Sequence, residues 1–363
     1  MSNLRRSLST IAATSLLVAG MAGFGLAATA APADQSPDNG VTRGSVVTHA
    51  HVFETNPTPG RENGVAQGSC TGCLNSGSNI LYHSGGAVMS GGVTVYPIFY
   101  GNWSGTATNT ATFTSSAENK ANVLKFLAQL QSSSTAATNH YNINSDYYSI
   151  TGSGPKATKN FVSKSVTIGA SVDVAAAKTA LTDADIQAIV SAATAPGGAY
   201  GSANSKGIYM VLTSAGITAS MGTSSFLNNF CGYHGYFGTG PTKYAFVGDP
   251  SASLASCAAQ TLNSPHSTLG HNLTASDAMV SVVMHEIEEA VTDPQLNAWF
   301  DKLGYENGDK CAWVFGPTSS LSTGFSSTAA KYNYTDPSTN DIWYIQQNVK
   351  LVNSTSQACS TTR

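Results

Sequence analysis

The chain carries few charges and lacks the signatures of several large enzyme classes. Only 10% of its 363 residues are charged, while Gly, Ser, Thr, Asn and Ala are abundant. It contains no G-x-S-x-G nucleophile elbow, no P-loop and no G-x-G-x-x-G fingerprint. These absences argue against an α/β-hydrolase, a nucleotide-binding enzyme and a dinucleotide-dependent oxidoreductase.

Long apolar runs are confined to the first residues. Residues 1–30 combine two arginines, an apolar stretch and the ending Ala28-Thr29-Ala30, which is typical of a secretory signal peptide. No later stretch is long and apolar enough to span a bilayer, so we expect a secreted, extracellular protein that leaves the membrane after cleavage. Removing the leader leaves 15 basic and 20 acidic side chains, a net charge of −5. Nucleic acid is therefore not an expected partner.

Cysteines are sparse but even in number, six in all. Cys70 and Cys73 form a C-x-x-C sequence, but no second pair exists to complete a zinc ribbon. In an exported chain such cysteines form disulfides, although six cysteines allow fifteen connectivities. The pairs that we expect are Cys70–Cys73, Cys231–Cys257 and Cys311–Cys359.

Two regions follow the leader. Residues 31–78 are rich in Pro, Gly, Asn, Asp and Ser, which predicts an extended arm, linker or pro-segment. Residues 79–363 form a single predicted domain in which β-branched and aromatic runs alternate with helical periodicity. This alternation favours an α/β or mixed α+β fold, a central sheet with flanking helices. Predicted strands are 92–100, 163–170, 207–213, 243–248 and 341–349. Predicted helices are 117–131 and 183–192, and Thr182 caps the second helix.

Two features within this domain carry further expectations. Pro97 cannot donate to a sheet ladder, which places its strand at an edge or a bulge. Residues 230–240, FCGYHGYFGTG, are rich in glycine and aromatics and predict a loop. Tyr233 and His234 in this loop are candidates for lining a substrate cleft.

The stretch 274–311 contains His285-Glu286-Ile287-Glu288-Glu289, an H-E-x-x-E sequence. It lies in a predicted helix that Thr274 or Ser276 caps and Pro294 ends. At 100° per residue, one stripe is apolar and faces the core; its members are Val280, Val283, Met284, Ile287 and Val291. His285 and Glu289 lie together on the opposite side, with Thr292 beside them.

This arrangement predicts a zincin-like metal site. An imidazole and a carboxylate four residues apart project from successive turns and can share one ion, and zinc accepts both. In H-E-x-x-H metalloproteases the residue after the first histidine is the general base that deprotonates the attacking water, and Glu286 stands there. Glu289 replaces the second histidine, and the extra negative charge could favour another divalent ion.

A third ligand is expected downstream of the helix. We assign Glu306 as the ligand and Asp309 as the residue that orients a ligand from outside; Asp293, at the edge of the polar face, has the same supporting role. The order of Glu306 and Asp309 could be reversed. His234, His266 or His271 could also displace either.

Two non-catalytic interpretations remain open for the same residues. The polar side of the helix could be an ordinary solvated face, because short motifs produce false matches. Alternatively, acidic side chains could hold a structural calcium ion, since hard oxygen ligands suit it. The residues for such a calcium site are Asp293, Asp301, Glu306 and Asp309.

Four ordered segments resemble a known family. They are YHSGGAVMSGGVTVYPIFYGNW, FCGYHG, KYAFVGDPSASLASCA, and HEIEEAVTDPQLNAWFD with ENGDKCAW. Together they span roughly residues 80 to 359 and are similar to the bacterial and fungal branch of the Exordium family, also called phosphate-induced proteins. The resemblance implies a secreted or cell-wall protein, and plant members are associated with growth control.

Two functional hypotheses follow. The first is a secreted zinc-dependent metallohydrolase, peptidase-like, that acts on a protein, peptide or cell-wall component. The second is a non-catalytic extracellular or cell-wall signalling protein with a structural metal or none.

Overall fold

The computed structural model describes residues 49–55, 78–106, 115–352 and 356–363. The expected signal peptide, most of the expected arm and the expected Cys70–Cys73 pair lie outside these ranges. The described residues belong to one compact unit, residues 35–363. In this part of the chain, no helix has the length and apolar character needed to cross a membrane.

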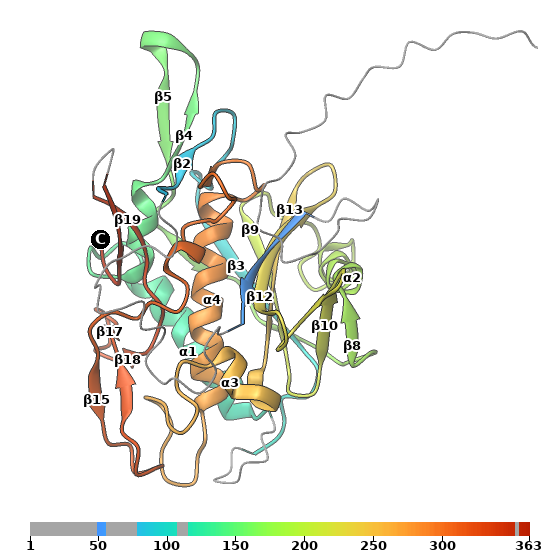
Figure 1. Ribbon diagram of the computed structural model, residues 1–363. Coiled ribbons are helices and arrows are strands. Elements are labelled where there is room, and N and C mark those ends of the chain that lie inside the picture. Colours follow the sequence, from blue (N-terminus) through green and yellow to red (C-terminus); the bar gives the residue numbers. More distant parts are fainter. Residues whose placement is uncertain (1–48, 56–77, 107–114, 353–355) are drawn as a thin grey trace, which may run out of the picture. The chain divides into compact units, whose positions relative to one another are not determined.

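A seven-stranded mixed sheet forms the centre of the molecule (Figure 1). Its order is β1-β12-β13-β9-β3-β6, with β7 also paired to β3. The pairs of β13 with β9 and of β9 with β3 are parallel, whereas β12 is antiparallel to both neighbours. The strands are β1 (His49–Glu54), β3 (Val93–Tyr100), β6 (Val166–Ile168), β7 (Val172–Val174), β9 (Gly207–Thr213), β12 (Phe230–Phe237) and β13 (Thr242–Gly248). The expected mixed α/β class is confirmed.

Helices and small sheets surround the central sheet. The helices are α1 (Ala117–Ser133), α2 (Asp183–Thr194), α3 (Leu254–Cys257) and α4 (Thr274–Thr292), with 3₁₀ turns η1 (His140–Asp146), η2 (Gly154–Lys156), η3 (Pro250–Ser253) and η4 (Asp309–Cys311). The outer strands are β2 (Leu81–Tyr82), β4 (Tyr148–Thr151), β5 (Thr158–Phe161), β8 (Ala180–Thr182), β10 (Thr218–Met221), β11 (Ser224–Ser225), β14 (Trp299–Phe300), β15 (Ser319–Leu321), β16 (Ala330–Tyr332), β17 (Tyr334–Thr335), β18 (Ile342–Trp343), β19 (Asn348–Leu351) and β20 (Gln357–Ser360).

The two faces of the central sheet carry different helices, α4 on one side and α2 on the other (Figure 1). The β12 residue Gly232 lies against Val282 of α4, whereas Tyr244 of β13 donates a hydrogen bond to Asp183 of α2. Because side chains alternate along a strand, odd and even positions of β12 face different helices. The side of β12 on which a residue lies therefore decides whether it reaches α4.

Pro97 lies where the outer partner of β3 changes. β6 pairs with Val93–Val95 and β7 with Ile98–Tyr100, so the ladder is interrupted at Tyr96 and Pro97. β3 is not an edge strand, because β9 pairs along its other side. The missing N–H of proline is accommodated by a break in the neighbouring strand.

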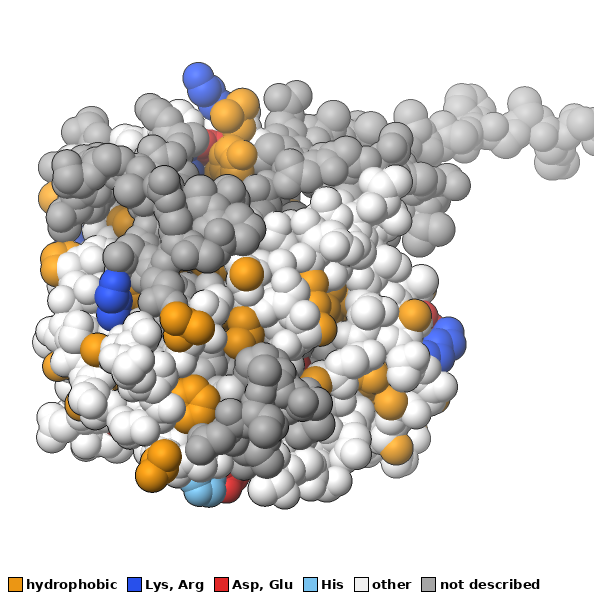
Figure 2. Space-filling model, turned by 60° about the horizontal axis from the view of Figure 1, so that its bottom comes forward, with side chains coloured by type: hydrophobic (Ala, Val, Ile, Leu, Met, Phe, Trp, Pro, Cys, Tyr) orange, Lys and Arg blue, Asp and Glu red, His pale blue; other side chains and the backbone are white. Residues whose placement is uncertain are grey.

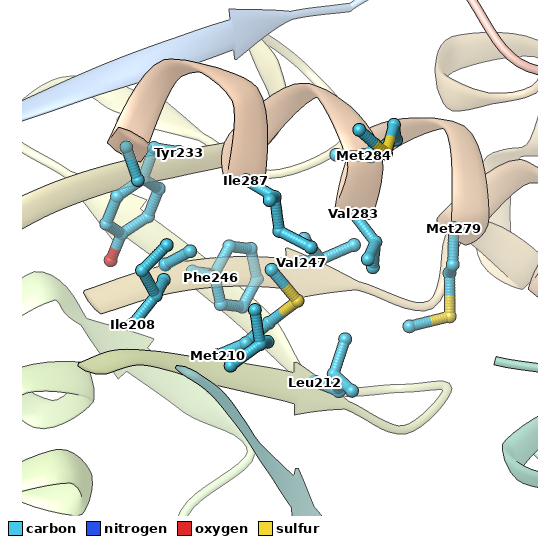
Figure 3. Packing of buried hydrophobic residues seen from close by; sticks show 14 of the residues in the cluster. Ile208, Met210, Leu212, Tyr233, Phe246, Val247, Met279, Val283, Met284 and Ile287 are labelled. Carbon is cyan, nitrogen blue, oxygen red and sulfur yellow. The ribbon is translucent and has the colours of Figure 1, made fainter. Parts of the chain in front are cut away.

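Every residue of α4 is buried. Its apolar stripe packs on the sheet as expected, with Val283 and Ile287 directed toward Val247 (Figure 3). The opposite, polar side is covered as well, so the solvated-face interpretation is wrong. The expected caps are also wrong, because Leu273 is the N-cap residue and the Ser276 hydroxyl donates to the Leu273 carbonyl.

Two predicted elements differ from the structure. Residues 230–237, expected in a loop, form strand β12, where Gly232 allows the close approach of α4. Residues 341–349, expected as one closing strand, form the separate strands β18 and β19. The gap between them contains Gln346, which is buried against α4.

The low charge of the sequence is visible on the surface. Figure 2 shows a face with few charged side chains, on which hydrophobic side chains are scattered and do not form one patch. Many acidic side chains are instead buried, among them Glu286, Glu288 and Glu289 of α4.

Candidate metal centre

Six polar side chains from three segments meet beside α4. The helix contributes His285, Glu286 and Glu289, β12 contributes His234, and the connection after β14 contributes Glu306 and Asp309. We refer to these six residues as the acidic centre. The helix places its members on successive turns, and the other members come from positions distant in sequence.

Two triads within the acidic centre have metal-binding geometry. His285, Glu289 and Asp309 form one, and His234, Glu289 and Glu306 form the other. In each triad, one ligand atom per residue lies within 4.8 Å of the others. Both triads are buried and Glu289 belongs to both.

The individual separations are short. His285 Nε2 lies 3.0 Å from Glu289 Oε1 and 3.7 Å from Asp309 Oδ1. His234 Nδ1 lies 3.4 Å from Glu289 Oε2, and its Nε2 lies 3.6 Å from Glu306 Oε2. Histidine nitrogens and carboxylate oxygens are ligands that zinc accepts.

Burial makes the centre electrostatically costly without a cation. Burial raises the pKa of Glu286 well above its usual range, and the neighbouring charges of Glu289 and Asp309 raise it further. The pKa of Glu306 is raised for the same reasons, burial first and then the charge of Glu289. Neither carboxylate oxygen of Glu286 accepts a hydrogen bond from the described residues. A bound divalent cation would offset this repulsion, so the residues fit a metal ion.

Two supporting residues fix the geometry of the centre. The amide nitrogen of Gln346 lies 2.8 Å from His285 Nδ1 and 2.9 Å from the Gly308 carbonyl oxygen. This contact fixes the ring of His285 with Nε2 on the side of Glu289 and Asp309. Gly308 passes so close that a Cβ atom there would lie 2.7 Å from His285 Nδ1 and 2.8 Å from Glu289 Oε1. Only glycine fits this position without displacing a ligand.

The comparisons with known proteins agree with the sequence resemblance. A family model described as the phosphate-induced protein 1 conserved region matches residues 80–361. This chain belongs to the phosphate-induced protein 1 family. All six residues of the acidic centre lie within the matched range.

Two plant relatives are similar over most of their length. Protein EXORDIUM-like 5 of Arabidopsis thaliana is 27% identical over 263 residues, covering 66% of this chain and 65% of that protein. Protein EXORDIUM-like 3 of the same plant is 26% identical over 297 residues, covering 74% of this chain and 80% of the relative. This chain thus covers slightly less than two thirds of Protein EXORDIUM-like 5. No solved structure matches.

In this phosphate-induced protein 1 chain, Asp293 and Asp301 belong to neither ligand triad. Asp293 follows α4, and its Oδ1 accepts hydrogen bonds from the backbone N–H groups of Asn297 and Ala298. It stabilises the turn after the helix, and its charge also raises the pKa of Glu306. Asp301 binds Lys310 at 2.8 Å. The four-residue calcium site therefore does not assemble, because two of its members hold other partners.

The expected substrate cleft of Tyr233 and His234 does not form as one surface. The two residues are adjacent on β12 and so face opposite sides of the sheet. Tyr233 is buried and stacks on Phe246, with ring centroids 5.4 Å apart, and its hydroxyl points away from α4 (Figure 3). His234 instead joins the acidic centre, as the sequence left open.

The remaining histidine candidates bind acidic partners elsewhere. His266 Nδ1 lies 2.7 Å from Asp277 Oδ1, and His271 Nδ1 lies 2.8 Å from Glu118 Oε2. Both therefore stabilise the segment that precedes α4.

Sequence reasoning missed two residues that support the centre. Gln346 and Gly308 act through contacts between distant segments, which no local sequence pattern predicts. Glu288, the remaining acid of the motif, lies on another side of α4, where its Oε1 is 3.3 Å from His140 Nε2. The helical spacing could have separated Glu288 from His285 and Glu289, because it lies about 100° from Glu289.

Proposed function

We propose that this protein is a secreted zinc-dependent hydrolase, peptidase-like, that acts on a protein, peptide or cell-wall component. His285, Glu289 and Asp309 would hold zinc, with Glu286 as the general base. One observation supports this proposal above all: imidazole and carboxylate groups from distant segments converge within 4.8 Å in the interior. Relative to the sequence-based ligand set, Asp309 replaces Glu306 beside His285, because Asp309 shares its triad.

In this proposal, each residue of the centre has a separate role in hydrolysis. Bound zinc would supply a Lewis acid and lower the pKa of water in its coordination shell. Glu286 would take a proton from the attacking water and return it to the leaving group, the role of the residue at this position in H-E-x-x-H hydrolases. Gln346 orients the His285 ring, and Gly308 leaves room for the ligands.

A small cavity of about 20 Å³ lies beside α4, lined in part by Ser281, Val282, Trp313, Phe315 and Tyr344. Ser281 lies one helical turn before His285, and its hydroxyl accepts a hydrogen bond from the Gln346 backbone. No member of the acidic centre lines this cavity, so entry of a substrate would require the segments around α4 to move.

Secretion and the branch of the family belong to the same proposal. Two disulfides, Cys231–Cys257 and Cys311–Cys359, join the cysteines as the sequence predicts, and disulfides persist in oxidising compartments. We place the chain in the bacterial or fungal branch that keeps H-E-x-x-E. Mass spectrometry of protein from culture medium is expected to find a chain that begins after Ala30; full-length protein held in the cytoplasm contradicts secretion.

Metal analysis of the purified protein tests the zinc site. Wild-type protein is expected to retain zinc after gel filtration, and His285→Ala is expected to retain less, because one of the three ligands of its site is removed. His271→Ala is the matched control, since His271 is half-exposed and binds Glu118. Equal zinc content in wild type and His285→Ala would remove this proposal.

The second candidate is a non-catalytic extracellular protein with a structural metal. The observation that favours it is burial, because His285, Glu286 and Glu289 are each 0% exposed, whereas catalysis needs access. Glu286→Gln separates the two candidates in folded, zinc-loaded protein. Loss of peptide hydrolysis supports the enzyme, and unchanged biological activity supports the structural role.

A further inference from the structure

Glu289 faces the two histidines of the acidic centre with different oxygens. Its Oε1 lies 3.0 Å from His285 Nε2 and accepts a 3.0 Å hydrogen bond from the Asp309 backbone N–H. Its Oε2 lies 3.4 Å from His234 Nδ1. The carboxylate of Glu289 therefore directs one oxygen toward His285 and the other toward His234.

Each triad has the composition and spacing of a separate metal site. When metal–ligand bonds are roughly 2.0–2.2 Å long, neighbouring ligand atoms lie about 3.0–3.6 Å apart, depending on the coordination geometry. In the first triad, His285 Nε2 lies 3.0 Å from Glu289 Oε1 and 3.7 Å from Asp309 Oδ1. In the second triad, one ligand atom from each of His234, Glu289 and Glu306 lies within 4.8 Å of the others. One ion alone leaves either His234 with Glu306 or His285 with Asp309 outside its coordination shell.

The charge of the centre matches two cations better than one. Four carboxylates belong to it, those of Glu286, Glu289, Glu306 and Asp309, and none of the four is more than 6% exposed. With neutral histidines, two divalent cations balance four ionised carboxylates, whereas a single ion would leave two of these carboxylates to be protonated or held by other groups. Buried charge without compensation is strongly unfavourable.

We propose that the acidic centre binds two divalent cations bridged by the carboxylate of Glu289. His285 and Asp309 complete one site, and His234 and Glu306 complete the other. This inference rests on the metal centre of the proposed function and extends it from one ion to two. Two-metal hydrolytic sites hold their ions about 3.5–4 Å apart, a separation that a bridging carboxylate supports.

Glu286 gains a defined place in this arrangement. Its Oε2 lies 3.4 Å from His234 Nδ1, and its Oε1 lies close to the backbone of Gly232. Glu286 therefore borders the site of His234, although it precedes Glu289 on the same helix. The proposed general base therefore lies beside both sites, next to His285 in the sequence and next to His234 in space.

Titration of the full chain with metal tests the inference. Chelated, dialysed protein is loaded with zinc and, separately, with manganese, and bound metal is measured by mass spectrometry. Two ions per chain are expected in wild type, and about one in Glu306→Gln and in Asp309→Asn. Glu118→Gln is the matched control because Glu118 is exposed and distant from the centre; it is expected to retain two.

A second measurement does not depend on the variants folding. Two manganese ions bridged by one carboxylate are expected to give an exchange-coupled electron paramagnetic resonance spectrum in the wild-type protein. One ion per chain, or two ions without coupling, overturns this inference and leaves the proposed function standing. No bound ion in any preparation overturns both.

Discussion

Gly308 shows how one residue without a side chain determines the shape of the acidic centre. The backbone of Gly308 lies against the ring of His285 and the carboxylate of Glu289. The carbonyl of Gly308 also accepts a hydrogen bond from the side-chain amide of Gln346. The φ of Gly308, −66°, is ordinary, so the demand for glycine comes from space and not from backbone conformation. A methyl group here would push directly on two proposed ligands.

Gly308→Ala is expected to weaken metal binding more than it weakens the fold. The added Cβ would meet His285 Nδ1 at 2.7 Å, and displaced ligands typically cost about 10–100-fold in metal affinity. Overpacking adds a stability loss of about 1–3 kcal/mol. Zinc titration and urea unfolding measure the two effects. Gly240→Ala is the control, because a Cβ there meets nothing within 4 Å; equal zinc affinity in both variants contradicts the expectation.

At the scale of elements, α4 depends on a polar network at its beginning. Asp277 in its first turn binds His266 and accepts a 2.8 Å hydrogen bond from Asn122 of α1. His266 also reaches Asp341, 3.2 Å from its Nε2. Three segments are thereby joined where the helix starts, which replaces the side-chain cap that the sequence suggested.

The His266 network gives the stability of the protein a pH dependence. Burial alone would lower the pKa of His266, but Asp277 and Asp341 outweigh it and raise the pKa from 6.5 to about 9. Because the folded pKa is higher, protonated His266 stabilises the fold fully below pH 6.5. This contribution, on the order of 1–3 kcal/mol, is lost as pH rises through 9.

Urea unfolding of wild type and His266→Gln from pH 6 to 10 measures this contribution. The difference between the two free energies of unfolding is expected to be largest at pH 6 and to shrink toward pH 10. His271→Gln, at an exposed position, is expected to show a small difference at every pH. A constant difference for His266→Gln would show that its charge does not contribute.

At the scale of the whole molecule, a disulfide links the C-terminal strand to the acidic centre. Cys311 ends the short turn η4 that begins with Asp309, and it pairs with Cys359 of β20, 48 residues away. The last residues also contact η1, where the Thr361 carbonyl oxygen lies 2.8 Å from His140 Nδ1. The C-terminal segment therefore supports the walls of the centre.

Removing this disulfide with Cys311→Ser and Cys359→Ser is expected to cost about 2–4 kcal/mol of stability. Zinc affinity is expected to fall as well, because Asp309 loses its covalent support. Thr182→Ala provides a destabilising control, since it removes the capping box of α2 at about 1 kcal/mol without touching the centre. If both variants bind zinc equally well, the disulfide has no role in the site.

The amino-acid sequence determined those features that depend on neighbouring residues along the chain. Thr182 predicted the start of α2, the run of residues 207–213 matched β9, and helical spacing placed His285 beside Glu289. These follow from caps and periodicity, which act over a few residues. The family and two of the three expected disulfides also followed from the sequence alone.

Only the tertiary structure decided which distant groups meet. His234, predicted in a loop, lies on a strand that faces α4, and Tyr233 lies on the other face of the sheet. Gln346, for which no role was predicted, contacts His285. The tertiary structure also buries the polar side of α4. These outcomes depend on packing between separate segments of the chain, and neither spacing nor composition encodes such contacts locally.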